Sequence, residues 1–241
     1  EVTSLAASKL TGALPAISAT NLTNIPAANI TGTLPALNGA SLTSVNAVNS
    51  GRKNIIINGD MRISQRGSYS SATSVANVTY YLDRWRTALN AVAGTITHST
   101  EVVSSVTFES LLLTATSSAT GHLAVTQPIE FPTSYRGVEL TISAKVKSNS
   151  SNARISFWGG SGGTLGNSTA HTGGGAVETL SATFTVPSNA TLMDGYIGLI
   201  STGTSNLAIS SGDYAKIFDV QVERGSVATD FEHRSYGEEL A

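Results

Sequence analysis

Histidine and cysteine, the residues most often used for metal binding and covalent chemistry, are scarce in this chain. It has no cysteine, and its four histidines are His98, His122, His171 and His233. No two of them have the HxH or HExxH spacing with which nearby histidines bind a metal ion. The sequence therefore predicts no cysteine nucleophile and no thiolate or histidine metal centre, and we expect His98 and His122 to be exposed residues of a sheet.

Acidic residues are present, but nothing in the sequence pairs them. Cleavage of a glycosidic bond needs two carboxyl groups roughly 5–10 Å apart in a cleft. The candidates are Asp83, Glu101, Glu109, Glu130, Glu139, Glu178, Asp194, Asp213 and Asp219. There is also no GxSxG elbow, no GxxxxGK[ST] phosphate loop and no DxDxDG calcium loop. We therefore expect no enzymatic activity, no cofactor and no metal site.

Aromatic residues indicate a different chemistry, the recognition of sugars by stacking on a ring face. The candidates are Tyr80, Tyr81, Trp85, Tyr135, Trp158, Tyr196 and Tyr214. We expect Trp85 to be buried in the core. Trp158 borders the glycine-rich stretch 159–175, which is predicted to be a mobile loop at one rim, so Trp158 is the exposed candidate, with core burial as the alternative. Tyr135 and Arg136, in "PTSYRG", form a second candidate rim. The predicted glycan-binding residues are thus Trp158, Tyr135 and Arg136.

The elements that would position these residues are short strands. From Asn54 onward, runs bounded by Gly, Ser and Asn read as strands: "NIIIN", "GTITH", "EVVSSVTFESLLLTATS", "GHLAVTQPI", "VELTISAKVKS", "ARISFWGG", "TLSATFTVP", "YIGLI", "LAISS" and "AKIFDVQVERG". In "ELTISAKVKS", apolar and polar residues alternate as in a half-buried antiparallel strand. Only "DRWRTAL" tolerates a helix. The pattern predicts an all-β head domain over residues 51–241, an antiparallel β-sandwich with a jelly-roll-like topology.

Composition excludes several classes of partner. The net charge is -2 and charged residues make up 12% of the chain, so no basic field predicts nucleic-acid binding. No run of 18 apolar residues predicts membrane insertion. Because the first residue is Glu1 rather than Met, we expect a fragment of a longer chain.

Residues 1–50 carry an internal repeat. "LTGALPAI" begins at Leu10, and "ITGTLPAL" begins 20 residues later at Ile30. Proline and glycine inside each copy argue against a helix, and one unit has too few apolar side chains to form its own core. Three chains in register would stack them in layers, whereas a flexible linker is the alternative. The predicted core of this trimeric stalk is Leu10, Leu14, Ile17, Leu22, Ile25, Ile30, Leu34, Leu37, Leu42 and Val45.

On these residues the chain resembles bacteriophage tail fibre proteins. Residues 3–47 are similar to their shaft repeats. The stretches "NIIINGDMRISQRG" and "IFDVQVERGSVATDFEHRSYGEELA" are similar to the head domains that follow such shafts, which look like carbohydrate-binding modules. The resemblance implies a homotrimer in the virion that contacts other phage tail or baseplate proteins and a host cell-surface polysaccharide or lipopolysaccharide. Family members commonly continue beyond "EELA", so the resemblance implies that Ala241 is a truncation or processing point.

The sequence therefore predicts a structural virion protein, a segment of a homotrimeric tail fibre that attaches to the host surface by binding a glycan. One alternative is a head that serves only as a connector or folding cap, with adhesion carried by residues beyond Ala241. A polysaccharide depolymerase is the other, but such enzymes use long parallel β-helices that this sequence does not contain.

Overall fold

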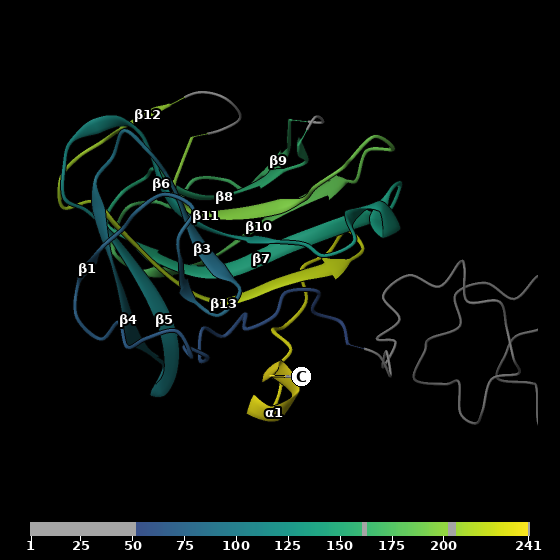
Figure 1. Cartoon of the computed structure of the whole chain (residues 1–241), viewed down its shortest axis with the longest axis horizontal. Helices are drawn as coiled ribbons and strands as arrows, with labels where there is room; N and C mark the ends of the chain where they lie inside the picture. Colours follow the sequence, from purple (N-terminus) through teal and green to yellow (C-terminus); the bar gives the residue numbers. More distant parts are fainter. Residues whose placement is uncertain (1–51, 161–162, 202–205, 241) are drawn as a thin grey trace, which may run out of the picture. The chain divides into compact units, whose positions relative to one another are not determined.

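The computed structural model describes residues 52–160, 163–201 and 206–240, in which two antiparallel sheets lie face to face (Figure 1). The strands are β1 (Thr73–Ser74), β2 (Tyr80–Leu82), β3 (Trp85–Asn90), β4 (Gly94–Val103), β5 (Val106–Ala115), β6 (Ala119–Pro128), β7 (Glu139–Ser148), β8 (Ala153–Trp158), β9 (Thr164–Asn167), β10 (Val177–Thr185), β11 (Asp194–Leu199), β12 (Leu207–Ile209) and β13 (Tyr214–Arg224). A 3-10 helix, η5 (Pro132–Tyr135), follows β6, and a short helix, α1 (Tyr236–Leu240), comes last.

The strand order differs from the chain order in both sheets. The six-stranded sheet runs β1-β4-β5-β13-β7-β10, and the seven-stranded sheet runs β2-β3-β6-β11-β8-β9, with β12 paired to β6. The central strands therefore come from distant parts of the sequence: β13 lies between β5 and β7. The predicted all-β, antiparallel β-sandwich is confirmed.

The core lies between the sheets, where alternate residues of each strand point inward. In β7, Leu140, Ile142, Ala144 and Val146 are each at most 1% exposed, as their spacing predicts. Across the core, the ring of Phe157 from β8 stacks on that of Phe184 from β10 at 4.2 Å. Burying one such large side chain contributes about 1.5–3 kcal/mol to the free energy of folding.

The polar face of β7 is more buried than the sequence indicates. Thr141 and Ser143 are 1% and 6% exposed. Thr141 donates to the carbonyl of Gly225, the first residue after β13. The half-buried strand that the alternation predicts is therefore more buried than expected at Thr141 and Ser143, because residues after β13 cover part of that face.

Three sequence assignments need correction. The stretch 101–117 is not one strand: β4 ends at Val103, and Ser104 and Ser105, at φ 49° and 67°, form the two-residue turn to β5. Two positive φ angles in succession are typical of a type I′ hairpin turn. The usual sequence signal of such a turn is Asn-Gly, and Ser-Ser does not provide it. Residues 54–58 are irregular, and "DRWRTAL" contains β3, whose Trp85 is buried in the core.

The first and last described segments are bound to each other. The carboxylate of Glu232 accepts hydrogen bonds from the backbone amides of Lys53 and Asn54 at 3.2 and 2.7 Å. Arg234 donates to the carbonyl of Asn54, and Glu239 accepts from the amide of Asn58 at 2.6 Å. The stretches "NIIINGDMRISQRG" and "IFDVQVERGSVATDFEHRSYGEELA", on which the resemblance to tail fibre head domains rests, are therefore in contact with each other.

The predicted stalk core, Leu10, Leu14, Ile17, Leu22, Ile25, Ile30, Leu34, Leu37, Leu42 and Val45, lies outside the described residues. The division into a stalk (1–50) and a head (51–241) stays a prediction. Among the described residues, no helix is long and apolar enough to cross a membrane.

Candidate functional site: a groove on the seven-stranded sheet

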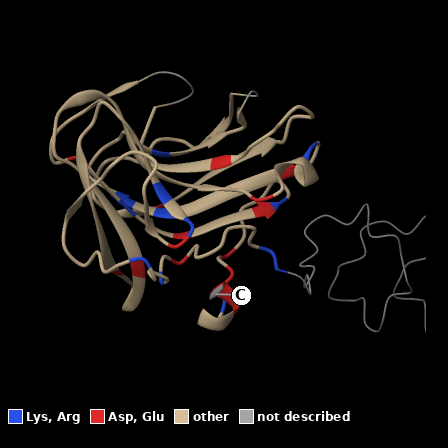
Figure 2. Ribbon diagram, in the orientation of Figure 1, with Lys and Arg blue, Asp and Glu red and all other residues tan. Residues whose placement is uncertain are grey.

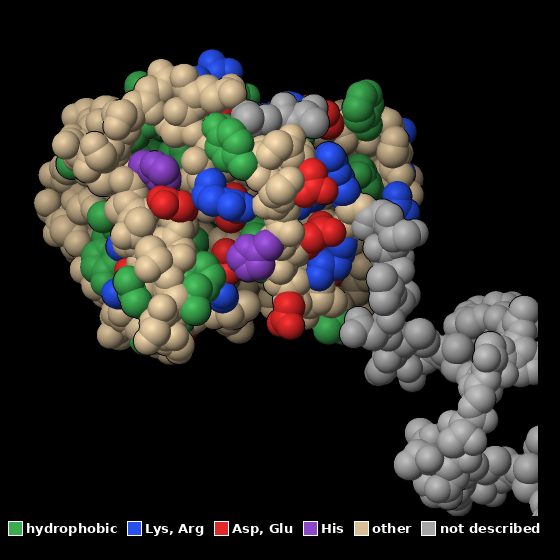
Figure 3. Space-filling view, turned by 90° about the horizontal axis from the view of Figure 1, so that it is seen from below, with side chains coloured by type: hydrophobic (Ala, Val, Ile, Leu, Met, Phe, Trp, Pro, Cys, Tyr) green, Lys and Arg blue, Asp and Glu red, His purple; other side chains and the backbone are tan. Residues whose placement is uncertain are grey.

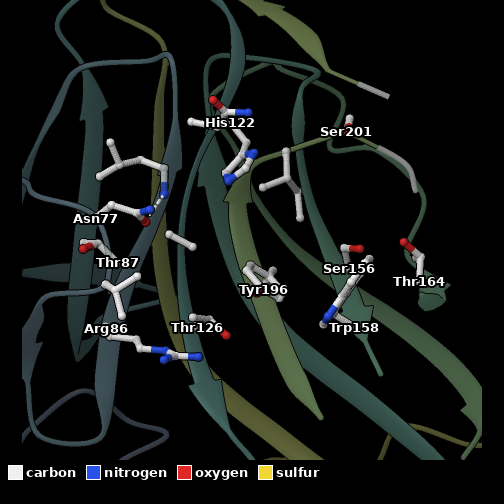
Figure 4. A pocket seen from close by; sticks show the side chains of 15 residues that line it. Asn77, Arg86, Thr87, His122, Thr126, Ser156, Trp158, Thr164, Tyr196 and Ser201 are labelled. Carbon is white, nitrogen blue, oxygen red and sulfur yellow. Dashed lines mark hydrogen bonds between the residues drawn. The ribbon is translucent and has the colours of Figure 1, made fainter. Parts of the chain in front are cut away.

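A groove of about 530 Å³ lies on the outer face of the seven-stranded sheet (Figure 4). Side chains from β3, β6, β8 and β11 line it, together with the segment before β2. Its lining residues are Asn77, Val78, Arg86, Thr87, Ala88, Leu89, Asn90, His122, Thr126, Ser156, Trp158, Thr164, Tyr196, Ile200 and Ser201.

Strand register brings the polar part of this lining together. Arg86, Thr126, Tyr196 and Ser156 are paired in one row across β3, β6, β11 and β8. Their inward neighbours Trp85, Val125, Ile197 and Phe157 are at most 1% exposed. Three intervals between adjacent strands span about 14 Å. The row is therefore long enough to contact a short oligosaccharide rather than a single sugar.

In the adjacent row, three of the four strands carry small residues and β8 carries Arg154. Ala88, Ala124 and Gly198 occupy the corresponding positions of β3, β6 and β11. A Cβ atom at Gly198, whose φ is 152°, would lie 2.5 Å from the carbonyl oxygen of Leu123. Glycine is thus required for β11 to pair closely with β6, and these small residues leave space between the Arg86–Ser156 row and His122.

Two half-buried aromatic rings line the groove. Trp158 is the last residue of β8 and pairs with Asp194, two residues before Tyr196 on the same face of β11. In Figure 4 Tyr196 lies between Thr126 and Ser156, and Trp158 lies beside Ser156. Half-buried rings can stack on the apolar CH face of a pyranose while the rest of the sugar contacts polar groups.

The opposite wall is formed by the segment before β2. The side-chain oxygen of Asn77 accepts a hydrogen bond from the amide of Leu89 at 3.1 Å, and the amide of Val78 donates to Thr87 at 3.0 Å. Val78 adopts φ 56°, an unusual conformation for a β-branched residue. These bonds hold the planar amide of Asn77 at the groove.

Burial changes the acid–base properties of three residues at this site. It raises the pKa of Asp194 above its ordinary value, and the positive charge and hydrogen bond of Arg86 offset this only in part. Burial, and then the charge of Asp194, raise the pKa of Tyr196. Burial lowers the pKa of His122. At neutral pH the groove therefore presents a neutral imidazole and a protonated phenol, both able to hydrogen-bond a sugar hydroxyl.

Two buried polar atoms near the rings have no hydrogen-bond partner among the described residues. They are Oγ1 of Thr126 and Oδ1 of Asp194, on residues that are 1% and 5% exposed. An unsatisfied buried polar atom costs about 1–3 kcal/mol, so such atoms are uncommon in folded proteins. Both lie on the outer face of the sheet, next to Tyr196.

The structure separates the three residues predicted to bind glycan. Trp158 lines the groove, but Tyr135 and Arg136 do not. Tyr135 ends η5, where the guanidinium of Arg224 lies 5.4 Å from its ring centre, and Arg136 donates to the carbonyl of Ala190 at 2.7 and 3.0 Å. Part of the predicted loop 159–175 is strand β9.

Sequence reasoning missed most of the groove. Tyr196 was one of seven aromatic candidates, whereas Arg86, Thr126 and Ser156 were not candidates at all. His122, predicted to be an exposed sheet residue, is half-buried in the groove. Alternation within each strand could have placed these side chains on outer faces, but it does not tell which strands are neighbours.

The polar part of the lining consists of aromatic, amide, hydroxyl, imidazole and guanidinium side chains. None of the lining residues is a carboxylate. The described residues also contain no group of three or more His, Asp or Glu side chains that could hold a metal ion. The aromatic rings, amides, hydroxyls and the Arg86 guanidinium are the residue types that bind sugar hydroxyls and ring faces.

No protein-family model and no curated protein matches the chain. Among solved structures, the enzymatically active domain of tailspike protein 4 of bacteriophage CBA120 aligns at 14% identity and TM-score 0.42, covering 71% of this chain and 21% of its own. The CBM22-1–GH10 modules of Clostridium thermocellum xylanase 10B, complexed with xylohexaose, align at 15% identity and TM-score 0.40, covering 69% and 30%. The CBM22-1 xylan-binding domain of Paenibacillus barcinonensis Xyn10C aligns at 14% identity and TM-score 0.37, covering 67% and 99%.

This chain thus spans about a fifth of the tailspike domain and less than a third of the xylanase modules. At such identities and TM-scores, the similarities support no statement about function.

Proposed function

We propose that residues 51–241 are a glycan-binding head domain and that the groove on the seven-stranded sheet is its binding site. The supporting observation is the juxtaposition of Trp158 and Tyr196, both half-buried, with Arg86, Asn77 and His122 in one groove. A purely structural sheet face would not need rings and planar polar groups directed into a common hollow.

We further propose that the chain is a segment of a homotrimeric phage tail fibre in the virion. The 20-residue repeat ahead of an all-β head supports this, since three registered chains would close a stalk and carry three heads. Its partners would then be other tail or baseplate proteins and a polysaccharide or lipopolysaccharide of the host surface. Linking three weak sites raises the apparent affinity by about 10²–10⁴ when they can bind together. In such a fibre, the head domain would have a jelly-roll-like strand topology.

The groove is proposed to bind without cleaving. Its lining lacks the two carboxylates that glycoside hydrolysis needs. Incubation of the protein with the bound glycan should therefore release no shorter oligosaccharides, and release of such products would favour the depolymerase alternative.

The proposal is tested by binding of the labelled chain to a glycan array and to bacterial cells before and after periodate oxidation. Trp158→Ala should weaken binding about 30-fold or more, because stacking on an aromatic ring supplies a large part of the energy at such hot spots. Phe131→Ala is the matched control, since Phe131 is 76% exposed but does not line the groove.

Unchanged binding by Trp158→Ala, with loss in Phe131→Ala, would place the site elsewhere. No binding to any glycan or cell would leave the connector reading, in which the head has no receptor site of its own. A monomeric chain in sedimentation analysis would overturn the trimeric stalk.

A further inference from the structure

Charged residues are sparse on the strands that form the groove. Figure 2 shows few coloured positions along β6, β8, β9 and β11, and their sequences contain only Arg154 and Asp194. On β3 the one charged residue is Arg86. Whether the groove carries a net charge therefore depends on how these three residues and His122 are paired.

Arg86 and Asp194 neutralise each other. Nη2 of Arg86 lies 3.1 Å from Oδ2 of Asp194, and the two side chains are 24% and 7% exposed. His122 is neutral at pH 7, because burial lowers its pKa. Asp83, Arg84 and Glu130 lie beyond the ends of β3 and β6, where Arg84 and Glu130 pair at 2.6 Å. The lining of the groove is thus close to electrically neutral.

The burial of the Asp194 carboxylate is unfavourable, and its contacts within the fold offset this only in part. It is nearly buried, and only one of its two carboxylate oxygens has a partner among the described residues. Burial raises its pKa despite the adjacent guanidinium. Ion pairs of this kind often contribute little to stability, whereas perturbed carboxylates concentrate at functional sites.

We propose that Asp194 is a specificity-determining residue that neutralises Arg86 and so makes the groove select uncharged glycans over uronate-containing ones. This rests on the proposed glycan-binding function. A sugar carboxylate entering the groove would lose water without gaining a free cation, because Asp194 already occupies the guanidinium. Unpaired charges of this kind are a common means of rejecting a competing ligand.

A positive charge at Arg154 would favour the opposite result, a preference for acidic glycans. It projects from the same face of β8 as Ser156 and has no ion-pair partner among the described residues. However, it does not line the groove. If Arg154 recruited the ligand, the protein would prefer acidic glycans, and that preference would overturn the proposal.

The test compares one glycan in two forms. The neutral oligosaccharide that binds best on the array is oxidised at C6 to the corresponding uronate, and calorimetry measures the affinity of each form. We expect wild-type protein to bind the neutral form at least about tenfold more tightly, a difference comparable to one unpaired charge in a partly desolvated site. Asp194→Asn, which releases Arg86, should reduce this ratio about fivefold or more.

Two further variants keep the result interpretable. Asp219→Asn is the matched control: Asp219 is also 5% exposed and pairs with Lys145 at 2.7 Å, but it lies on the six-stranded sheet, and its substitution should leave the ratio unchanged. Arg86→Gln removes the cation and leaves Asp194, so the ratio should rise. If Asp194→Asn does not fold, Arg86→Gln alone tests the prediction.

An unchanged ratio in both groove variants, or a wild-type preference for the uronate, would overturn the role of Asp194 while leaving glycan binding intact. Absence of binding to either form, and to every glycan on the array, would overturn the proposed function and this inference with it.

Discussion

Both sheets consist of strands in which side chains alternate between the core and the outer face. The polar residues on the two outer faces nevertheless make different contacts. On the six-stranded sheet, Glu101 of β4 accepts from Lys147 at 2.7 Å and from Lys216 at 3.0 Å, so three strands are joined by one carboxylate. On the seven-stranded sheet, polar side chains border an open groove instead.

The pairing on the six-stranded sheet is extensive. Asp219 binds Lys145 at 2.7 Å, and the ammonium of Lys145 lies 4.3 Å from the ring centre of Phe108. The carboxylate of Glu223, which is 2% exposed, accepts hydrogen bonds from Thr229 in the segment after β13. Acidic and basic side chains also lie next to one another on the surface seen in Figure 3.

In this fold, polar residues that stabilise the structure can therefore be distinguished from polar residues that are available to a ligand. Where donors and acceptors satisfy one another, as around Glu101, little capacity is left for a ligand. Where Thr126 and Asp194 each keep an oxygen with no partner in the described part of the chain, and Tyr196 and Trp158 are half-exposed, the face retains capacity to bind. Three substitutions test this contrast.

The largest effect on stability is expected for Glu101→Gln. It leaves Lys147 and Lys216 without their shared carboxylate and should lower the free energy of unfolding by about 2 kcal/mol, because these groups are only partly exposed. Urea unfolding at pH 7 measures this. Glycan binding should stay unchanged, and a loss of binding with unaltered stability would contradict the division between the two faces.

A smaller, pH-dependent effect is expected at Glu232. Burial alone would raise the pKa of Glu232, but hydrogen bonds from the amides of Asn54 and Lys53 and the nearby positive charges lower it below its ordinary 4.5. Because the folded-state pKa is depressed, the stabilisation is fully present above pH 4.5 and is lost as the pH falls below it.

Glu232→Gln should therefore cost about 1–2 kcal/mol at pH 7 and flatten the loss of stability between pH 5 and roughly pH 3. Urea unfolding across this range measures both effects. Glu139→Gln, at an exposed carboxylate, is the control. An equal flattening in both variants would show that Glu232 has no special role in joining the two terminal segments.

The smallest effect on stability is expected for Tyr196→Phe in the groove. The Tyr196 hydroxyl makes no hydrogen bond to the described residues, so its loss should change the free energy of unfolding by less than about 0.5 kcal/mol. Glycan affinity should nevertheless fall about fivefold, the value of one hydrogen bond. Calorimetric titration measures it, with Tyr236→Phe on α1 as the control; equal affinities of Tyr196→Phe and wild type would remove the hydroxyl from the site.

Elements whose pattern is local can be predicted from the sequence alone. Alternation in "ELTISAKVKS" predicts the inward side of β7, and the position of Trp85 in "YLDRW" predicts its burial; both agree with the structure. The absence of cysteine also rules out cysteine nucleophiles and thiolate metal sites without any coordinates. These features are readable because each depends on neighbours within a few residues.

Which outer-facing residues form a site depends instead on the order of the strands in the folded sheet. Arg86, Thr126, Ser156 and Tyr196 come from strands separated by up to 110 positions in the chain, and they become neighbours only through the order β3-β6-β11-β8. Tyr135 and Arg136 looked equally suitable in sequence but turn to other contacts. A strand pattern specifies which side of a sheet a residue faces, whereas strand order depends on the packing of the whole core, which no local pattern encodes.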